Sequence, residues 1–229
     1  KIEKAVIMFH KALAKIESFE NQMQFSKLLI EIHMNMANIY ESIGNYSVCT
    51  MHLEKTVAVA KIFYGPLDPF VSTYLNQLGL MYYKEQKFAT ALTAFMECLH
   101  IRTNCNKNSK NQIIAVMYNI ATVCNAMGMT EKALTIYRRV LIYERQIIKE
   151  QQGRSQPKDL IHTLRHIFQI YKEQGIPKDG LEYLLEAVDL CRQYKDKIYT
   201  ILGQSIFFLM GEYLTLNQKV TDGFRYYCE

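Results

Sequence analysis

The sequence repeats itself at a spacing of 42 residues, and this feature constrains the fold more than any other. Three segments come into register when the chain is slid along itself: MNMANIYESIGNYSVC from Met34, NQLGLMYYKEQKFATA from Asn76 and YNIATVCNAMGMTEKA from Tyr118. A period of about 20–50 residues is typical of arrays in which each unit packs against its neighbours and no single central core is needed. A repeat array is therefore the first fold to consider for this 229-residue chain.

The first half of each segment has the periodicity of a helix with one buried face. A large apolar residue precedes a small one, and a further candidate core position follows one turn later, at Met36-Ala37-Tyr40, Leu78-Gly79-Tyr82 and Ile120-Ala121-Cys124. This spacing of three to four residues predicts an amphipathic helix. The next positions, where such a helix must end in the left-handed region, are Gly44, Gln86 and Gly128. Glycine at two of the three favours a turn there.

The second half of each segment predicts another helix that packs against the first. Small residues are followed four positions later by large ones, at Cys49 and Leu53, Ala91 and Phe95, and Ala133 and Tyr137. A small side chain lets two helices approach, and the large one fills the space between them. Further upstream, Gly65-Pro66-Leu67-Asp68-Pro69 indicates a loop, with Asp68 as the cap of a helix that begins near Pro69.

The same pattern extends over most of the chain and predicts an all-α fold. It continues less cleanly over 168–184 and 211–227, and before the first full unit only a second helix fits, at Ala5, Phe9 and Ala12. We expect a single array over 1–229, a fragment of a longer chain, made of a half repeat over 1–20 and repeats over about 25–64, 69–104, 111–150, 158–194 and 196–229. No segment shows the alternation of a β-strand.

Composition and motifs argue against several classes of function. The 27 basic and 22 acidic residues are spread along the chain, without the dense Lys/Arg runs of a nucleic-acid binder. Six cysteines show no C-x-x-C pairing and suit helix interfaces in a reducing compartment. There is no phosphate-binding loop or nucleophile–base pattern, so we expect neither an enzyme nor a cofactor. No apolar run has the length of a membrane span, and we expect a cytoplasmic protein, with the cytoskeleton or cilium as possible places of association.

The repeat resembles the tetratricopeptide repeat, and its long period is similar to that of the kinesin-light-chain subtype, whose hairpins exceed the usual length of about 34 residues. The closest stretch is YGPLDPFVSTYLNQLGLMYYKEQKFATALTAFMECLHIR, from Tyr64 to Arg102. It matches that subtype in the loop Asp-Pro, the Asn-rich start of the helix and the closing Ile-Arg. The resemblance implies a right-handed superhelical solenoid of antiparallel helix hairpins, in which the first helix of each hairpin lines the concave face.

Projection of the first helices onto that concave face gives a set of candidate peptide-binding residues. These are Asn35, Asn38, Asn76, Gln77, Leu80, Tyr83, Lys84, Tyr118, Asn119, Thr122, Asn125, His162, Arg165, His166 and Lys172. Carboxamides dominate the first three units, and a carboxamide can both donate to and accept from an extended peptide backbone. In the family that the chain resembles, an Asn at the position of Asn35, Gln77 and Asn119 lines the peptide groove. The alternative is that these side chains are solvated or bond to one another between repeats.

Two smaller sets of residues have alternative interpretations. Leu80, Tyr83 and Tyr118 would give the groove specificity, although a buried role between helices fits each aromatic nearly as well. His162, Arg165, His166 and Lys172 form a basic cluster that could receive an acidic stretch. His162 and His166 are spaced for a metal, but no third ligand accompanies them, and no metal is expected.

Two functions remain open at this point. The first is an intracellular adaptor that holds an extended peptide or partner segment on the concave face. The second is a structural scaffold subunit of a larger trafficking or ciliary assembly, which docks through its convex face and ends; the aromatic residues that would provide this surface are Phe207, Phe208, Tyr213 and Tyr226. Both require protein or peptide partners, in a multi-subunit complex for the second, and neither requires nucleic acid or membrane insertion.

Overall fold

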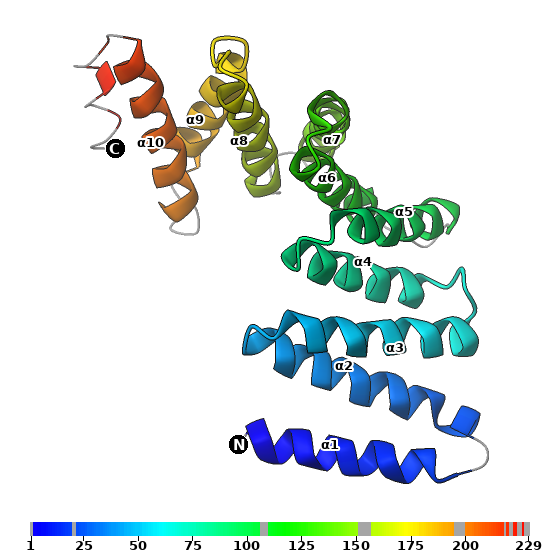
Figure 1. The fold of residues 1–229 in the computed structure, drawn as a ribbon. Coiled ribbons are helices and arrows are strands. Elements are labelled where there is room, and N and C mark those ends of the chain that lie inside the picture. The colour runs from blue at the N-terminus through cyan, green and yellow to red at the C-terminus, as the bar shows by residue number, and fades with distance from the viewer. Residues whose placement is uncertain are drawn as a thin grey trace. The chain divides into compact units, whose positions relative to one another are not determined.

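The protein is built from consecutive helices, in agreement with the predicted all-α class (Figure 1). The computed structural model describes residues 2–19, 22–105, 110–150, 157–194, 200–217, 219, 222–223 and 226. The repeat expected over 196–229 lies partly outside these residues, and Cys228 lies outside them. Over the described ranges the chain contains helices and turns and no β-strand.

The helices follow one another with short connections. Their bounds are α1 Ile2–Glu17, η1 (a 3-10 helix) Gln22–Phe25, α2 Ser26–Ser42, α3 Tyr46–Tyr64, α4 Pro69–Lys84, α5 Phe88–Asn104, α6 Lys110–Ala126, α7 Thr130–Glu150, α8 Lys158–Glu173, α9 Leu181–Gln193 and α10 Thr200–Leu216. None of these described helices is long and apolar enough to cross a membrane.

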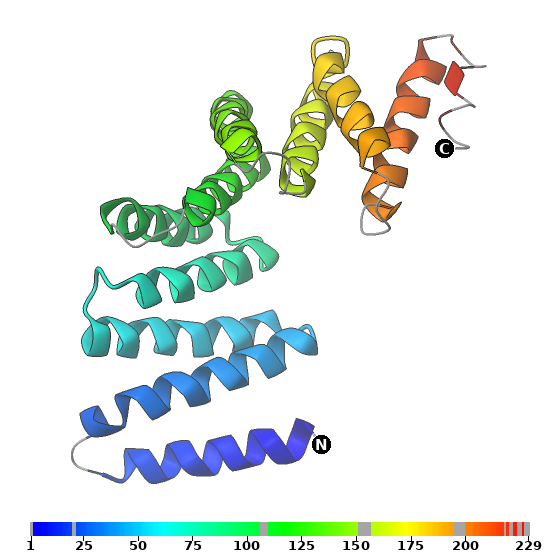
Figure 2. The same cartoon turned by 180° about the vertical axis from the view of Figure 1, so that it is seen from behind.

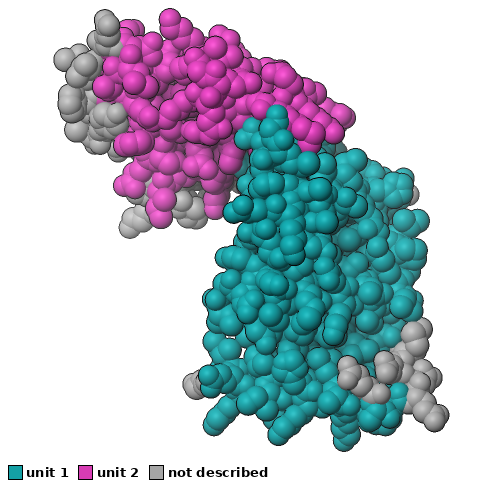
Figure 3. Space-filling view, in the orientation of Figure 1, with its two compact units in different colours: residues 1–128 teal, residues 129–229 magenta. Residues whose placement is uncertain are grey.

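The chain divides into two compact units, coloured separately in Figure 3. Unit 1, residues 1–128, holds α1 to α6, and each helix packs against the next, with a further contact between α4 and α6. Unit 2, residues 129–229, holds α7 to α10, which also pack in chain order. The stacking of successive helices in unit 1 is seen from both sides in Figures 1 and 2. The single array over 1–229 and its repeat boundaries stay a prediction.

Left-handed residues end several of the helices, as the sequence predicts. Gly44, Gly128 and Gly175 have φ values of 75°, 75° and 77°. Gln86 occupies the equivalent turn with φ 60°, the one non-glycine residue with positive φ in the described part of the chain. At the other predicted boundary α4 begins at Pro69, and Asp68 accepts a hydrogen bond from the Phe70 N–H at 2.8 Å. The Asp68 cap and the left-handed residue Gln86 therefore mark the beginning and the end of α4.

The core consists of the small and large residues that recur in the sequence. Cys49, Ala91 and Ala133 are at most 1% exposed, and so are Phe95 and Tyr137. Along the first helices the buried positions include Met36, Ala37, Leu78, Ile120 and Ala121. Removal of such apolar surface from water is the main favourable term in folding. The same positions that mark the repeat in the sequence thus form the interfaces between helices.

Gly79 illustrates how closely the helices of one hairpin approach. A Cβ atom placed on Gly79 of α4 would lie 2.7 Å from Cε1 of Phe95 on α5, inside van der Waals contact. In the preceding hairpin the equivalent residues are Ala37 and Leu53, a larger residue facing a smaller one. The total volume at this crossing is therefore shared differently by the two hairpins.

We predict that Gly79→Ala destabilises the chain although alanine favours helices. Overpacking costs about 1–3 kcal/mol, whereas the gain in helix propensity is about 1 kcal/mol. We expect a net loss on the order of 1 kcal/mol in the free energy of unfolding, measured by urea denaturation followed by circular dichroism. The double variant Gly79→Ala/Phe95→Leu, which copies the Ala37–Leu53 pair, should be more stable than Gly79→Ala. Equal stability of wild type and Gly79→Ala would contradict the close approach.

Candidate peptide-binding surface

Three first helices of unit 1 adjoin one another and carry most of the predicted site. Lys84 Nζ of α4 lies 2.8 Å from Glu41 Oε1 of α2. Asn119 Nδ2 of α6 donates to Asn76 Oδ1 of α4 at 3.1 Å. We call α2, α4 and α6 the first-helix layer. Side chains thus connect its three members directly, in addition to the packing through α3 and α5.

The predicted carboxamides of this layer differ in their surroundings. Asn35 and Asn38 on α2 are exposed, whereas Gln77 and Asn119 are half-buried. The Asn119 amide is engaged by Asn76, which is the inter-repeat hydrogen bond given above as the alternative. Gln77 Oε1 is buried and has no hydrogen-bond partner among the described residues. The exposed groups that could meet a peptide backbone therefore concentrate on α2.

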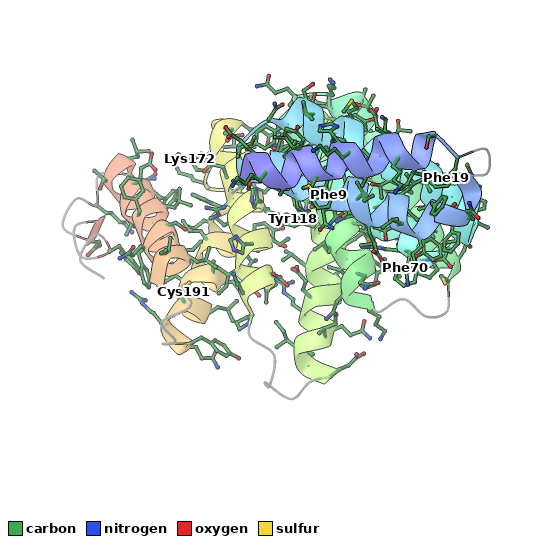
Figure 4. All side chains as sticks on the ribbon, turned by 90° about the horizontal axis from the view of Figure 1, so that it is seen from below. Phe9, Phe19, Phe70, Tyr118, Lys172 and Cys191 are labelled. Carbon is green, nitrogen blue, oxygen red and sulfur yellow. The ribbon has the colours of Figure 1, made fainter. Side chains whose placement is uncertain are left out.

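The apolar and aromatic candidates lie next to these carboxamides along the same helices. Leu80 is 36% exposed, and Tyr83 is half-buried with its ring 5.6 Å from the ring of Phe88. Tyr118, labelled in Figure 4, is half-buried, and its carbonyl accepts from the Thr122 hydroxyl at 3.0 Å. Tyr83 is thus partly engaged in packing, while Leu80 presents apolar surface to solvent.

Lys84 is held by two contacts that neutralise or cover its charge. Besides the ion pair with Glu41, its ammonium lies 5.0 Å from the centre of the Tyr46 ring. Sequence reasoning did not identify these two partners. The sequence spacing could have indicated such partners, because Lys84–Glu41 and Asn119–Asn76 both join residues that are 43 positions apart, one repeat plus one residue. The first-helix layer consequently offers little net positive charge at Lys84.

The predicted basic cluster lies on α8 in unit 2 and carries less charge than its composition suggests. Burial, with Arg165 close by, lowers the pKa of His166 to about 4 and also lowers that of His162, so both imidazoles are neutral at pH 7. The His166 ring stacks on Tyr137 with centroids 6.0 Å apart. Lys172 Nζ lies 2.7 Å from Glu212 Oε2 of α10. No set of three metal ligands occurs among the described residues.

Exposed apolar side chains gather at the corner between α3 and α4. Ile62, Phe63, Leu67 and Phe70 are 48–63% exposed. The Tyr64 ring lies 4.7 Å from Phe63 and 5.2 Å from Phe70, centre to centre. We call Ile62, Phe63, Leu67 and Phe70 the corner patch. Figure 4 places Phe70 at the same edge of unit 1 as Phe19, which is also exposed.

The aromatic residues proposed for docking in unit 2 are engaged to different degrees. Tyr213 packs edge-on against the buried Phe168 at 6.2 Å, and the Tyr226 ring lies 5.0 Å from the Arg192 guanidinium. Phe207 is half-buried, and Phe208 is 58% exposed. Of these four, Phe208 therefore provides the clearest apolar surface.

The cysteines described by the structure are mostly buried, and none is in a disulfide with another described residue. Cys49, Cys98, Cys124 and Cys191 are buried, and burial raises the pKa of Cys49, Cys98 and Cys191 to about 11. A thiol with so high a pKa has little thiolate at neutral pH and is a poor nucleophile. The Cys98 thiol instead donates to the Ser72 carbonyl at 3.1 Å. These side chains fill helix interfaces.

A stack of helices that pack in chain order, with residues of one repeat bonded to those of the next, defines a helical-repeat protein. The family model for the tetratricopeptide repeat matches residues 28–104 and 75–142, which together cover half of the chain. This protein therefore belongs to the tetratricopeptide-repeat family.

Solved structures support the same fold. BtubC (BKLC) from P. vanneervenii superposes with a TM-score of 0.69 at 20% identity, covering 84% of this chain and 74% of that one. A Podosopora anserina putative kinesin light chain with nearly identical TPR-like repeats gives 0.69 at 13% identity, covering 91% and 93%. The Rap conjugation gene regulator of plasmid pLS20, in complex with the Phr* peptide, gives 0.64 at 12%, covering 86% and 51%. Comparison with curated protein sequences gives no match.

Glu144 of α7 is a buried carboxyl group at the contact between α7 and α8. It is 7% exposed, and its Oε1 accepts from the Thr163 hydroxyl at 3.2 Å, while Oε2 has no hydrogen-bond partner among the described residues. Burial raises its pKa to about 7 from the ordinary 4.5, and Asp159 acts in the same direction. Glu144 is thus largely protonated in the folded chain under mildly acidic conditions.

We predict that Glu144→Gln stabilises the chain at pH 8 but not at pH 4. The unfolded carboxyl loses its proton near pH 4.5 and the folded one near pH 7, so wild-type stability falls as pH rises through this window. A neutral amide avoids that loss, on the order of 2–3 kcal/mol at pH 8. Urea denaturation at both pH values measures the difference, with Glu150→Gln, an exposed carboxyl on the same helix, as control. An equal effect of Glu144→Gln at both pH values would contradict it.

Proposed function

We propose that this protein is an intracellular adaptor that holds an extended peptide segment of a partner protein on the first-helix layer of unit 1. The proposal rests mainly on one observation: side chains join α2 to α4 and α4 to α6, and carboxamides recur at corresponding places along these helices, at Asn35, Gln77 and Asn119. Tetratricopeptide arrays use extended concave surfaces for binding. The peptide-bound Rap regulator has the same fold, which is consistent with a peptide ligand here.

The chemistry of the layer favours a ligand recognised through its backbone. Asn35 and Asn38 are exposed and present both donors and acceptors, as an extended peptide does. Lys84 is paired with Glu41, which disfavours recognition of an acidic ligand at that place. Leu80, one turn after Gln77, offers a neighbouring apolar contact. An uncharged segment with an aliphatic side chain fits these groups best.

The carboxamides should contribute unequally to binding. Asn119 and Asn76 already bond to each other, so their replacement would disturb the contact between α4 and α6 as well as the surface. Asn35 and Asn38 have no such contact among the hydrogen bonds described for the chain, and their truncation leaves the helix packing intact. Variants of the α2 pair therefore report on binding with little change in stability.

We predict that a random peptide library displayed on phage yields binders to the full chain and that Asn35→Ala/Asn38→Ala weakens them. Each lost hydrogen bond costs about 0.5–1.5 kcal/mol, so the dissociation constant should rise roughly tenfold. Fluorescence polarisation with a selected synthetic peptide measures it. Asn104→Ala, an exposed carboxamide at the end of the second helix α5, is the matched control. The adaptor proposal fails if no peptide is selected, or if selected peptides bind the α2 variant as tightly as wild type.

The corner patch supports a second candidate function, a scaffold subunit that docks through its outer edge. Exposed aromatic and aliphatic side chains in one cluster are typical of protein contacts. Selected peptides or partners that bind Asn35→Ala/Asn38→Ala normally but lose binding to Phe63→Ser/Leu67→Ser would identify this function. These two residues are exposed, so their replacement leaves the core unchanged.

A further inference from the structure

The first hairpin of unit 1 contains two buried histidines that face each other. His33 on α2 is 5% exposed and His52 on α3 is 2% exposed. Their Nδ1 atoms lie 3.0 Å apart, within hydrogen-bond distance, and their rings are 5.2 Å apart between centroids. The pair thus places a polar contact between the two helices of the hairpin, inside their buried interface.

The contact between the two Nδ1 atoms can hold only one proton. A neutral imidazole carries a proton on one nitrogen and a lone pair on the other, so one Nδ1–H donates and the other Nδ1 accepts. A second proton at this contact would point two N–H groups at each other across 3.0 Å. If His52 is the donor, a proton added at its Nε2 would place a charge on a buried atom that has no hydrogen-bond partner in the described structure. If His52 is the acceptor, its Nε2 already carries a proton, and only Nδ1, at the contact itself, is left to take another. Either form of His52 protonation is therefore unfavourable.

The surroundings of the pair do not compensate an added positive charge. The Tyr40 ring of α2 stacks on His52 at 5.7 Å. The titratable groups that act on the pair besides the histidines themselves are Lys55 on α3 and His10 on α1, both of which disfavour further protonation. The charge environment thus acts in the same direction as burial.

Helix α4 also packs on this hairpin, and ionisable groups of α4 and of its C-cap bond to residues other than the histidines. Tyr82 donates to Glu54 of α3 at 2.6 Å, and Glu85 accepts from the Thr50 hydroxyl. Lys84 pairs with Glu41, as described above. The carboxylates at the contact with α4 are therefore already engaged by a tyrosine, a threonine and a lysine.

The histidine pair departs from the pattern of the repeat. One period further along, the equivalent residues are Leu75 and Ala94, which are 3% and 6% exposed. Two periods along, the sequence has Met117 and Ile136. The fold therefore fills this place with apolar side chains elsewhere, and hydrogen bonding is not required for a hairpin of this length to form. Of the three places compared, the first therefore carries a titratable pair and the next two carry apolar residues.

We propose that the His33–His52 pair makes the α2–α3 hairpin acid-labile, so that proton uptake opens this hairpin while the α4–α5 hairpin stays closed. Opening would also displace α2, which carries Asn35 and Asn38. The inference concerns the hairpin itself and holds whether or not the first-helix layer binds a peptide.

The direction and window of the effect follow from proton linkage. Burial lowers the pKa of both His33 and His52 to about 4, whereas an open hairpin would return them to the ordinary value of 6.5. The open form therefore binds more protons between these values, and the closed form loses stability as pH falls from 6.5 toward 4. Above pH 6.5 both forms are neutral, and the contribution is constant.

Hydrogen exchange followed by mass spectrometry on the full chain tests the proposal at pH 7 and pH 5. After correction for intrinsic exchange rates, protection of α2 and α3 should fall by at least about 20-fold between pH 7 and pH 5, the linkage expected for one histidine. Protection of α4 and α5 should change much less. The variant His33→Leu/His52→Ala copies the Leu75–Ala94 pair and should abolish the difference between the two hairpins. His100→Gln, an exposed histidine on α5, should retain it.

Three results would overturn the proposal. One is equal loss of protection in both hairpins of wild type, and another is an unchanged pH response in His33→Leu/His52→Ala. If that variant does not fold, an NMR titration of the His33 and His52 imidazoles in wild type provides the test. Both imidazoles should stay neutral down to about pH 5, and protonation at pH 6 or above is the third result that would refute the inference.

Discussion

The packing of a small residue on one helix against a large residue on the next is the constraint on which this structure depends. Where Gly79 meets Phe95 there is no room for a single additional carbon atom. The preceding hairpin has Ala37 and Leu53 at the equivalent places, so a larger small residue there goes with a smaller large one. The first-helix layer depends on this packing, because α3 and α5 lie between its members and pack against them.

The fold could be read from the sequence because its determinants are local or periodic. The glycines at 44 and 128 and the Asp68-Pro69 pair act within a few residues, and the 42-residue period identifies the interfaces. Gln86 shows the strength of this context, since a residue other than glycine adopts φ 60° at the same turn. Backbone hydrogen bonds from the Gln86 N–H to Tyr83 and from the Lys87 N–H to Tyr82 close this turn, and the turn forms despite a local preference of roughly 1 kcal/mol against it.

The candidate site was less predictable because side-chain partners depend on three-dimensional neighbours. Projection onto a helix face identifies Lys84, Asn76 and Asn119. It does not show that Glu41 of the preceding first helix engages Lys84, or which of the candidate carboxamides bond to each other. For the same reason, the cluster on α8 is basic in composition, whereas burial keeps His162 and His166 neutral. The charge of a side chain and its availability to a ligand depend on its neighbours in the packed structure, so the periodicity of the sequence does not predict them.

The spacing of 43 residues between bonded side chains in the first-helix layer has a consequence for how such an array can change over evolution. Because a helix turns by about 100° per residue, one residue gained or lost inside α4 before Lys84 would rotate Lys84 away from Glu41. A residue added in the corner at Gly65–Asp68 changes no helical phase. Length variation is therefore tolerated at the corners, and the helices between them keep a fixed count.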